Sequence, residues 1–334
     1  MQRIVANLDA ESDWQALLDP QRPRRHLTRR ALDLVSGFGT LLRAWADARE
    51  PGTLWTPNTV DPARLTDRLP VPRLSSTSEA RPTAPDLEWG QLDRVSARVN
   101  HRRFAFELSH SLGIQLAGSR WVENLEDLRR AVSTLDRWVA KTPLSAAGRE
   151  RVFGRHVPDD STERRLHNLL SRCDGLLVEP WLDRIEDFGV LLEIDAGGSR
   201  FVSSHRQVVD TSGGFLGIDW QAEEPSEVSV WSEQLGTTAR TVGEALSREG
   251  YRGPAGIDVW AWRGEAGSVE LNSLAEINAR LSFGWVARQI GIRLDRTRVC
   301  LRLGSAQQLA AAGSRAEPLL LPDTAGHGAA WLKT

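Results

Sequence analysis

Lysine is nearly absent from this 334-residue chain, in which only Lys141 and Lys333 occur among 42 basic residues. A mutational bias toward GC-rich codons explains this scarcity, together with the abundance of alanine, glycine and proline. A lysine that survives such a bias is one that arginine cannot replace, because lysine is a compact point charge and arginine a wide planar fork. Lys333 is next to the C-terminus and is interpreted as incidental, whereas Lys141 lies mid-chain beside a glycine-containing loop.

Cysteine, long apolar runs and excess charge are also scarce. Cys173 and Cys300 lie far apart without metal-ligand spacing, so we expect buried free thiols. No run of 18 apolar residues occurs, and the N-terminus lacks a basic stretch followed by an apolar one, so we expect a cytoplasmic protein with no membrane partner. The formal net charge of −2 gives no reason to expect nucleic acid as a partner.

The histidines and tryptophans carry no recognisable site pattern. The seven histidines show neither triad nor zinc spacing, and only the pair His205-Arg206, on a predicted strand, is expected to face a substrate. The 13 tryptophans are expected to fill the core, since no basic stripe accompanies them.

Hydrophobic periodicity indicates an α+β fold. The pattern predicts helices over residues 33–48, 92–112 (one helix or two) and 228–249, and one that Asn124 caps. It predicts strands over residues 3–7, 54–57, 138–141, 175–182, 188–194, 200–209, 255–262 and 268–277. The tail from Gly313 is weakly patterned.

Two carboxylates are expected to meet on the hairpin of residues 255–277. If the turn centres near Ala266, Asp258 lies opposite Leu274, and Glu276 is its diagonal neighbour on the same face. A one-residue slip would separate them. Because side chains alternate along a strand, Asn278 and Arg280 share the face of Glu276.

Oxygen ligands of this kind suit Mg²⁺, or Mn²⁺ in its place, shared with substrate phosphates. Arg280 is then placed to clamp a transferring phosphoryl group or a substrate carboxylate. The alternative is a solvated hairpin with ordinary surface charges. Glu270 and Asn272 repeat the Glu-x-Asn spacing nearer the turn and are interpreted as structural.

Two further segments suit a nucleotide. Lys141 ends a predicted strand, and the loop after it contains Gly148, whose backbone freedom lets amide groups approach a phosphate. The apolar strand 176–182 can present backbone groups to an adenine edge, with Asp187 or Glu186 bonding ribose hydroxyls. The alternatives are an ordinary loop and a buried strand with an acidic end.

Five segments, taken in order, resemble the ATP-grasp superfamily of carboxylate-amine ligases. They are VNHRRF (99–104), VAKTPLSAAGRER (139–151), LLVEPWL (176–182), GYRGPAGIDVWAW (250–262) and AEINARLSFG (275–284), within residues 93–290. The resemblance implies an ATP-grasp fold of two α+β lobes preceded by a small α/β domain. The expected units are an N-terminal domain (1–92), a first lobe (93–174), a second lobe with the metal site (175–313) and a C-terminal tail (314–334).

The resemblance also implies roles for individual residues. Lys141 matches the phosphate-binding lysine and Gly148 the loop over the phosphates. The adenine hinge matches Glu179, Trp181 and Leu182, and the ribose contact matches Asp187. The Mg²⁺ ligands match Asp258, Glu276 and Asn278, with Arg280 and Lys141 as the catalytic pair. Where many ATP-grasp enzymes have a further lysine, this chain offers Arg102 or Arg103.

The expected activity is a Mg-ATP-dependent ligation that passes through an acyl phosphate. The substrates are a small-molecule carboxylate and an amine or thiol, ADP and phosphate are released, and a homodimer is left open. Three alternatives stay open: a kinase-like phosphotransferase on the same fold, a non-catalytic nucleotide-binding protein, and an unrelated enzyme.

Overall fold

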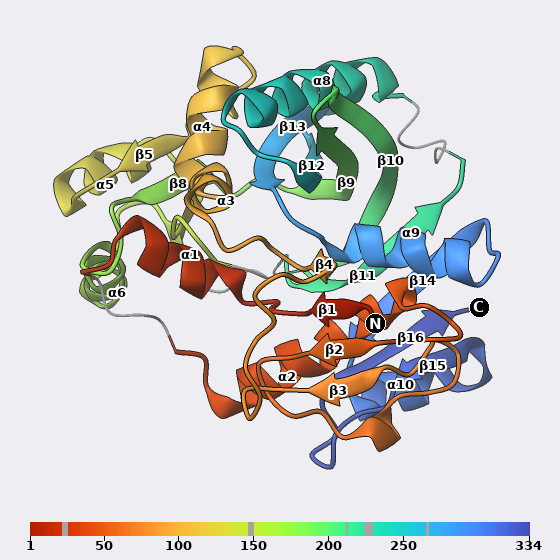
Figure 1. Ribbon diagram of the computed structural model, residues 1–334. Coiled ribbons are helices and arrows are strands. Elements are labelled where there is room, and N and C mark those ends of the chain that lie inside the picture. Colours follow the sequence, from red (N-terminus) through yellow and green to blue (C-terminus); the bar gives the residue numbers. More distant parts are fainter. Residues whose placement is uncertain (22–25, 146–149, 212, 224–229, 265–266) are drawn as a thin grey trace.

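The described residues form three β-sheets with flanking helices (Figure 1). The structure is a computed structural model that describes the whole chain except residues 22–25, 146–149, 212, 224–229 and 265–266. The predicted α+β fold is confirmed. Within the described ranges, no helix is both long enough and apolar enough to cross a membrane.

The first sheet is parallel, as expected of an α/β unit. Its strand order is β3-β2-β1-β4, and its strands are β1 (Arg3–Val5), β2 (Thr53–Trp55), β3 (Arg73–Ser75) and β4 (Leu87–Glu88). The helical elements of this part are α1 (Ala10–Leu18), α2 (Arg29–Gly39), η1 (Thr40–Trp45) and η2 (Pro62–Arg64). Thr28 begins α2 by accepting a hydrogen bond from the Ala31 amide, which satisfies one of the free N–H groups of the first turn.

The predicted helical region 92–112 forms two helices, α3 (Arg94–Val99) and α4 (Arg102–Ser111). An antiparallel sheet follows, with the order β5-β8-β6-β7. Its strands are β5 (Arg120–Val122), β6 (Arg137–Lys141), β7 (Arg151–Arg155) and β8 (Leu176–Pro180), and its helices are α5 (Leu125–Val132) and α6 (Asp160–Leu170). The predicted cap at Asn124 is confirmed, since its side chain accepts from the Asp127 amide at 2.9 Å.

The largest sheet has eight strands in the order β13-β12-β9-β10-β11-β14-β16-β15. They are β9 (Arg184–Asp195), β10 (Gly198–Val209), β11 (Phe215–Gln221), β12 (Gly253–Arg263), β13 (Val269–Asn278), β14 (Arg298–Gly304), β15 (Ala316–Leu320) and β16 (Ala329–Lys333). Its helical elements are α8 (Ser232–Arg248), α9 (Phe283–Arg293), α10 (Ala306–Ala312) and η4 (Gly313–Arg315). Helix α8 packs on β9 and β10, whereas α9 packs on β11 and β14 (Figure 1).

The C-terminal tail, predicted to be weakly patterned, supplies β15 and β16 of this sheet. Both strands are short, and Leu319, Leu320 and Ala330 are fully buried in the core beside α9. Five-residue apolar segments carry too few residues for a period to emerge, so tertiary packing decides their structure.

Strand β9 separates two hydrophobic cores. Phe188, Val190 and Leu192 belong to the core beneath α8, whereas Leu191 belongs to the core shared with α9 and the first sheet. Since neighbouring side chains point to opposite faces of a strand, Asp187 and Gly189 share the face of Leu191. This second face carries the candidate site.

Candidate active site

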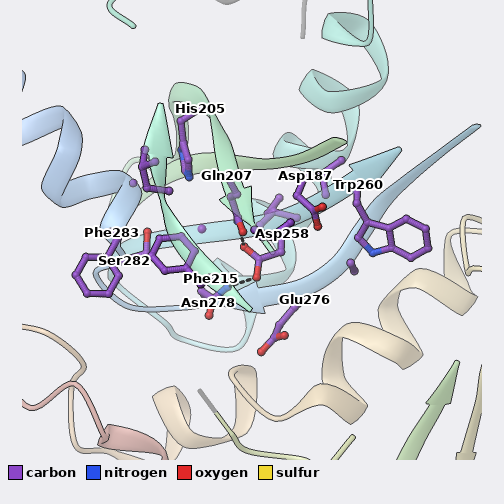
Figure 2. A pocket seen from close by; sticks show the side chains of 18 of the residues that line it. Asp187, His205, Gln207, Phe215, Asp258, Trp260, Glu276, Asn278, Ser282 and Phe283 are labelled. Carbon is purple, nitrogen blue, oxygen red and sulfur yellow. Dashed lines mark hydrogen bonds between the residues drawn. The ribbon is translucent and has the colours of Figure 1, made fainter. Parts of the chain in front are cut away.

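One row of directly paired residues crosses four strands of the large sheet. His205 on β10 pairs with Gly189 on β9, Gly189 with Asp258 on β12, and Asp258 with Glu276 on β13. Directly paired residues point to the same face, so His205, Asp258 and Glu276 line one cavity (Figure 2).

A bulge between β12 and β13 brings the two carboxylates together. Near the turn the register is the expected one, with Trp260 opposite Asn272. Between Trp260 and Asp258 the register shifts, because β13 has three residues (273–275) where β12 has only Val259. The expected pairing of Asp258 with Leu274 is therefore wrong, and Glu276 is its direct partner. The shift of two residues keeps both carboxylates on the expected face.

The Asp258 carboxylate is held by two amides. Gln207 Nε2 donates to its Oδ1 at 2.8 Å, and Asn278 Nδ2 donates to its Oδ2 at 3.1 Å (Figure 2). Burial, and next the negative charge of Glu276, raise the pKa of Asp258 to about 6. The two hydrogen bonds oppose this shift but do not cancel it. A cation between the carboxylates would stabilise the ionised pair.

The Glu276 carboxylate reaches across to helix α4. Arg102 Nη2 donates to both of its oxygens, at 2.8 and 3.0 Å. The same buried guanidinium also donates to Ser145 Oγ at 2.9 Å and to the Ser145 carbonyl at 3.0 Å. Arg102 thus joins the acidic hairpin to the segment that follows Lys141.

The three predicted metal ligands lie together. Asp258 and Glu276 are direct cross-strand partners, and Asn278 Nδ2 donates a hydrogen bond to Asp258. The amide oxygen of Asn278 takes no part in that bond. Two carboxylates and an amide oxygen are hard donors that fit Mg²⁺ when waters or phosphates complete the shell. In the part of the chain that the structure describes, no group of three or more His, Cys, Asp or Glu side chains could hold a metal ion. The three residues therefore fit a metal site that is completed by waters or phosphates, rather than a site in which protein side chains supply every ligand.

Lys141 lies across the same cavity and is buried. Its ammonium group pairs with the Glu179 carboxylate, and both side chains are less than a tenth exposed. Strands β6 and β8 are neighbours, with Val139 opposite Glu179. Glu179 thus holds the Lys141 side chain in place.

The cavity is more basic than acidic and has a volume of about 270 Å³. Its charged lining comprises three carboxylates (Asp187, Asp258 and Glu276) and five basic groups (Arg102, Lys141, Arg151, Arg184 and Arg280). Burial, followed by the nearby charges of Arg184 and Arg102, lowers the pKa of Arg151. Such a cluster of like charges favours a polyanion as the ligand.

Asp187 and Glu186 point to opposite faces of β9 in the structure. Asp187 lines the cavity and accepts from Arg184 at 2.7 Å. Glu186, on the opposite face of β9, pairs with Arg206 at 2.8 Å. Of the two candidate ribose contacts, only Asp187 therefore lies in the cavity.

The predicted adenine hinge lies apart from the cavity lining. Trp181 lines a separate hollow with Phe153 and Arg137, and its amide donates to the Arg137 carbonyl at 2.8 Å. Neither Glu179 nor Leu182 lines the cavity. Strand β8 pairs with β5 only as far as Val178 and with β6 as far as Pro180, so the predicted hinge lies at and beyond the end of this strand.

The remaining predicted residues lie as follows. Arg280 lines the cavity but pairs at 3.0 Å with Glu11 of α1. Arg103 is directed to the surface, where it pairs with Glu107 at 2.7 Å, so Arg102 is the arginine that faces the site. Gly148 lies outside the described residues.

His205 is buried within the cavity wall. Its Nδ1 has no hydrogen-bond partner in the part of the chain that the structure describes, and burial lowers its pKa to about 4. Glycine at positions 189 and 284 leaves room for the ring, because a Cβ atom at either position would lie within 2.3 Å of it. Sequence reasoning selected His205 but missed Gln207, which alternation along β10 places on the same face.

Structural comparison places the chain among known folds. Staphylococcus aureus N5-carboxyaminoimidazole synthetase, complexed with ADP, superimposes with a TM-score of 0.59 at 8% identity, covering 99% of this chain and 92% of that one. PurK, an N5-carboxyaminoimidazole ribonucleotide synthetase solved as an ADP complex, gives 0.56 at 11% identity, covering 99% and 91%. Biotin carboxylase from Campylobacter jejuni gives 0.53 at 10% identity, covering 99% and 86%.

These neighbours are ATP-grasp proteins, and this chain has the ATP-grasp fold. The resemblance seen in the sequence is thereby confirmed at the level of the fold. No family model matches the sequence, and no curated protein matches it.

Proposed function

We propose that the protein is a Mg²⁺- and ATP-dependent ligase that activates a carboxylate as an acyl phosphate and joins it to an amine or thiol. One observation carries this proposal: Lys141 and Arg102 from one side, and Asp258, Glu276 and Asn278 from the other, line the same cavity. Cationic groups facing oxygen donors suit a metal-bound polyphosphate.

The nucleotide would occupy the end of the cavity lined by Trp260 and Asp187 (Figure 2). There Lys141, Arg151 and Arg184 supply positive charge for phosphate oxygens. Asp187 offers a carboxylate to the ribose hydroxyls. The ADP complexes of two neighbours and the beta-gamma-ATP complex of biotin carboxylase support a nucleotide ligand at this fold's site.

Asp258, Glu276 and Asn278 would hold Mg²⁺, which supplies charge neutralisation on the phosphate oxygens. In the present structure Arg102 neutralises Glu276, so the guanidinium supplies the positive charge that a bound metal would bring. The two amides on Asp258 orient its carboxylate toward the cavity.

The proposed reaction consists of two successive displacements. A substrate carboxylate oxygen attacks the γ-phosphorus, the bond to the β,γ-bridging oxygen breaks, and ADP leaves. An amine then attacks the acyl carbon, the bond to the phosphate oxygen breaks, and the amine loses a proton. The side chains act by positioning and electrostatics, with Lys141 and Arg280 placed beside the transferred phosphoryl group.

Hydroxylamine tests the proposal, because it converts an acyl phosphate into a hydroxamate. We expect carboxylate-dependent hydroxamate and ADP from the wild type, and a loss of at least about 100-fold in Glu276→Gln. Glu270→Gln is the matched control, since Glu270 is exposed on the same strand, and it should retain full activity. ADP release without hydroxamate would indicate the phosphotransferase alternative. Failure to bind Mg-ATP would refute every ATP-dependent activity.

A further inference from the structure

We infer that the activated carboxylate substrate carries an aryl or branched-alkyl group, which binds in an aromatic chamber at one end of the cavity. This inference rests on the proposed ligase function and names its substrate class. The chamber is lined by Leu8, Val35, Phe38, Trp89, Phe215 and Phe283. Figure 2 shows Phe215 and Phe283 at the end of the pocket opposite Trp260, with Asp258 between them.

Phe283 lies at the centre of the cluster of aromatic rings that forms the wall of this chamber. Its ring stacks on Phe215 with centroids 5.5 Å apart, contacts Trp89 at 5.4 Å, and meets the edge of Phe38 at 6.4 Å. These rings come from four elements or loops distant in sequence: α2, the residue after β4, the start of β11 and the first turn of α9. The N-terminal residues therefore supply one part of the chamber wall, and the large sheet with helix α9 supplies the other.

The rings are only partly covered by protein. Phe38, Phe215 and Phe283 are half-buried, whereas the core residues behind them, such as Leu41 and Val286, are fully buried. All three rings line the cavity, so part of their remaining surface faces it. Covering apolar surface is favourable in proportion to its area, about 25 cal/mol per Å². An apolar ligand group would gain this free energy here.

A charged group would gain nothing in the same place. The side chains of the chamber wall are apolar and offer no opposite charge to such a group. His205, which lies beside the chamber against Gly284, is neutral because burial lowers its pKa to about 4. Desolvating a phosphate or a second carboxylate against this wall would be costly.

The chamber adjoins the reacting centre through a short piece of chain. Asn278, a proposed metal ligand, ends β13, and Arg280, Ser282 and Phe283 follow within five residues, all lining the cavity. A single molecule can therefore place its carboxylate beside Asn278 and Arg280 and its apolar group against Phe283. A small acid such as acetate would leave the chamber unfilled.

The test compares phenylpropanoate and 4-methylpentanoate with acetate and succinate. With Mg-ATP and hydroxylamine, the two apolar acids should give kcat/KM for hydroxamate formation roughly 100-fold above that of acetate. Calorimetry with Mg-ADP present should show phenylpropanoate binding at least tenfold more tightly than acetate. Equal binding of the four acids would overturn the inference whether or not turnover is seen.

Two variants make the test specific to the chamber. Phe215→Trp reduces its volume and should shift preference toward the smaller acids, with Mg-ATP affinity unchanged. Phe201→Ala, at an exposed site on β10, is the control and should leave the preference unaltered. An unchanged preference in Phe215→Trp would refute the chamber assignment, whereas failure to bind Mg-ATP would count against the proposed function instead.

Discussion

Replacing Lys141 by methionine tests whether this residue serves structure, catalysis or both. The change leaves the Glu179 carboxylate buried without its cation, since only 7% of that side chain is exposed. Breaking a buried pair in this way costs about 3–5 kcal/mol. The carboxylate can instead take up a proton, which for a glutamate at pH 7 costs about 4 kcal/mol and at pH 5 about 1 kcal/mol. The free energy of unfolding should therefore drop by about 3–4 kcal/mol at pH 7 and by much less at pH 5.

The double variant Lys141→Met/Glu179→Leu separates the two roles. Removing both charges from a buried pair is often neutral for stability, so urea denaturation should return to within about 1 kcal/mol of the wild type. Affinity for Mg-ATP should stay reduced by roughly 10- to 150-fold, because a charge-assisted contact worth about 1.5–3 kcal/mol is missing. Lys333→Met, at an exposed site, is the control for loss of a lysine charge.

Two results would refute this reasoning. If the double variant regained Mg-ATP affinity together with stability, Lys141 would serve only the fold. If the single variant were as stable as the wild type at pH 7, the ion pair would not be buried in solution.

Three further predictions concern Asp258, Arg43 and His205. Because burial and Glu276 raise the pKa of Asp258 to about 6, the metal-free folded protein holds a proton that the unfolded chain releases near pH 4. The contribution of Asp258 to wild-type stability should fall as the pH rises from 4 to 6. Asp258→Asn should therefore be more stable than the wild type at pH 8 and no more stable below pH 4, by urea denaturation, while losing Mg²⁺-dependent ADP release; a gain independent of pH would contradict this. Arg43 is fully buried and donates to the carbonyls of Thr66, Leu69 and Leu319 at 2.7–2.8 Å. Arg43→Ala should lower the free energy of unfolding by about 3 kcal/mol, and the exposed Arg49→Ala should not; equal effects would count against the buried contacts. Burial lowers the pKa of His205 to about 4, so its ring signals in NMR should not titrate between pH 5 and 8, and a midpoint near 6.5 would show that the ring is solvated.

The acidic hairpin shows how far sequence reasoning can reach. The turn and the alternation of side chains correctly placed Asp258 and Glu276 on one face. The same reasoning paired Asp258 with Leu274, because a bulge leaves no mark in an apolar-polar pattern. The extra residues of β13 moved Glu276 directly opposite Asp258 without changing its face. The alternation of side chains along a strand therefore predicted which face carries the two carboxylates, but not which residue lies directly opposite Asp258.

Partners across the cavity could not be predicted in the same way. The scarcity of lysine selected Lys141, but nothing in the sequence pairs it with Glu179. The sequence alone could not distinguish the roles of Arg102 and Arg103. In the structure, the first turn of α4 directs Arg102 to Glu276 and Arg103 to the surface. The aromatic chamber was also invisible, since Phe38, Phe215 and Phe283 lie far apart in the chain.

By itself the sequence determined the α+β class, eight of the sixteen described strands and the common face of Asp258 and Glu276, because these depend on local periodicity and on residue chemistry. Only the tertiary structure decided that the C-terminal residues complete the large sheet and that β8 is enclosed between β5 and β6. It also decided which charges neutralise one another. Such contacts join residues that are distant in sequence, 38 positions apart for Lys141 and Glu179 and 174 for Arg102 and Glu276. Their free energy depends on burial, which no local pattern encodes.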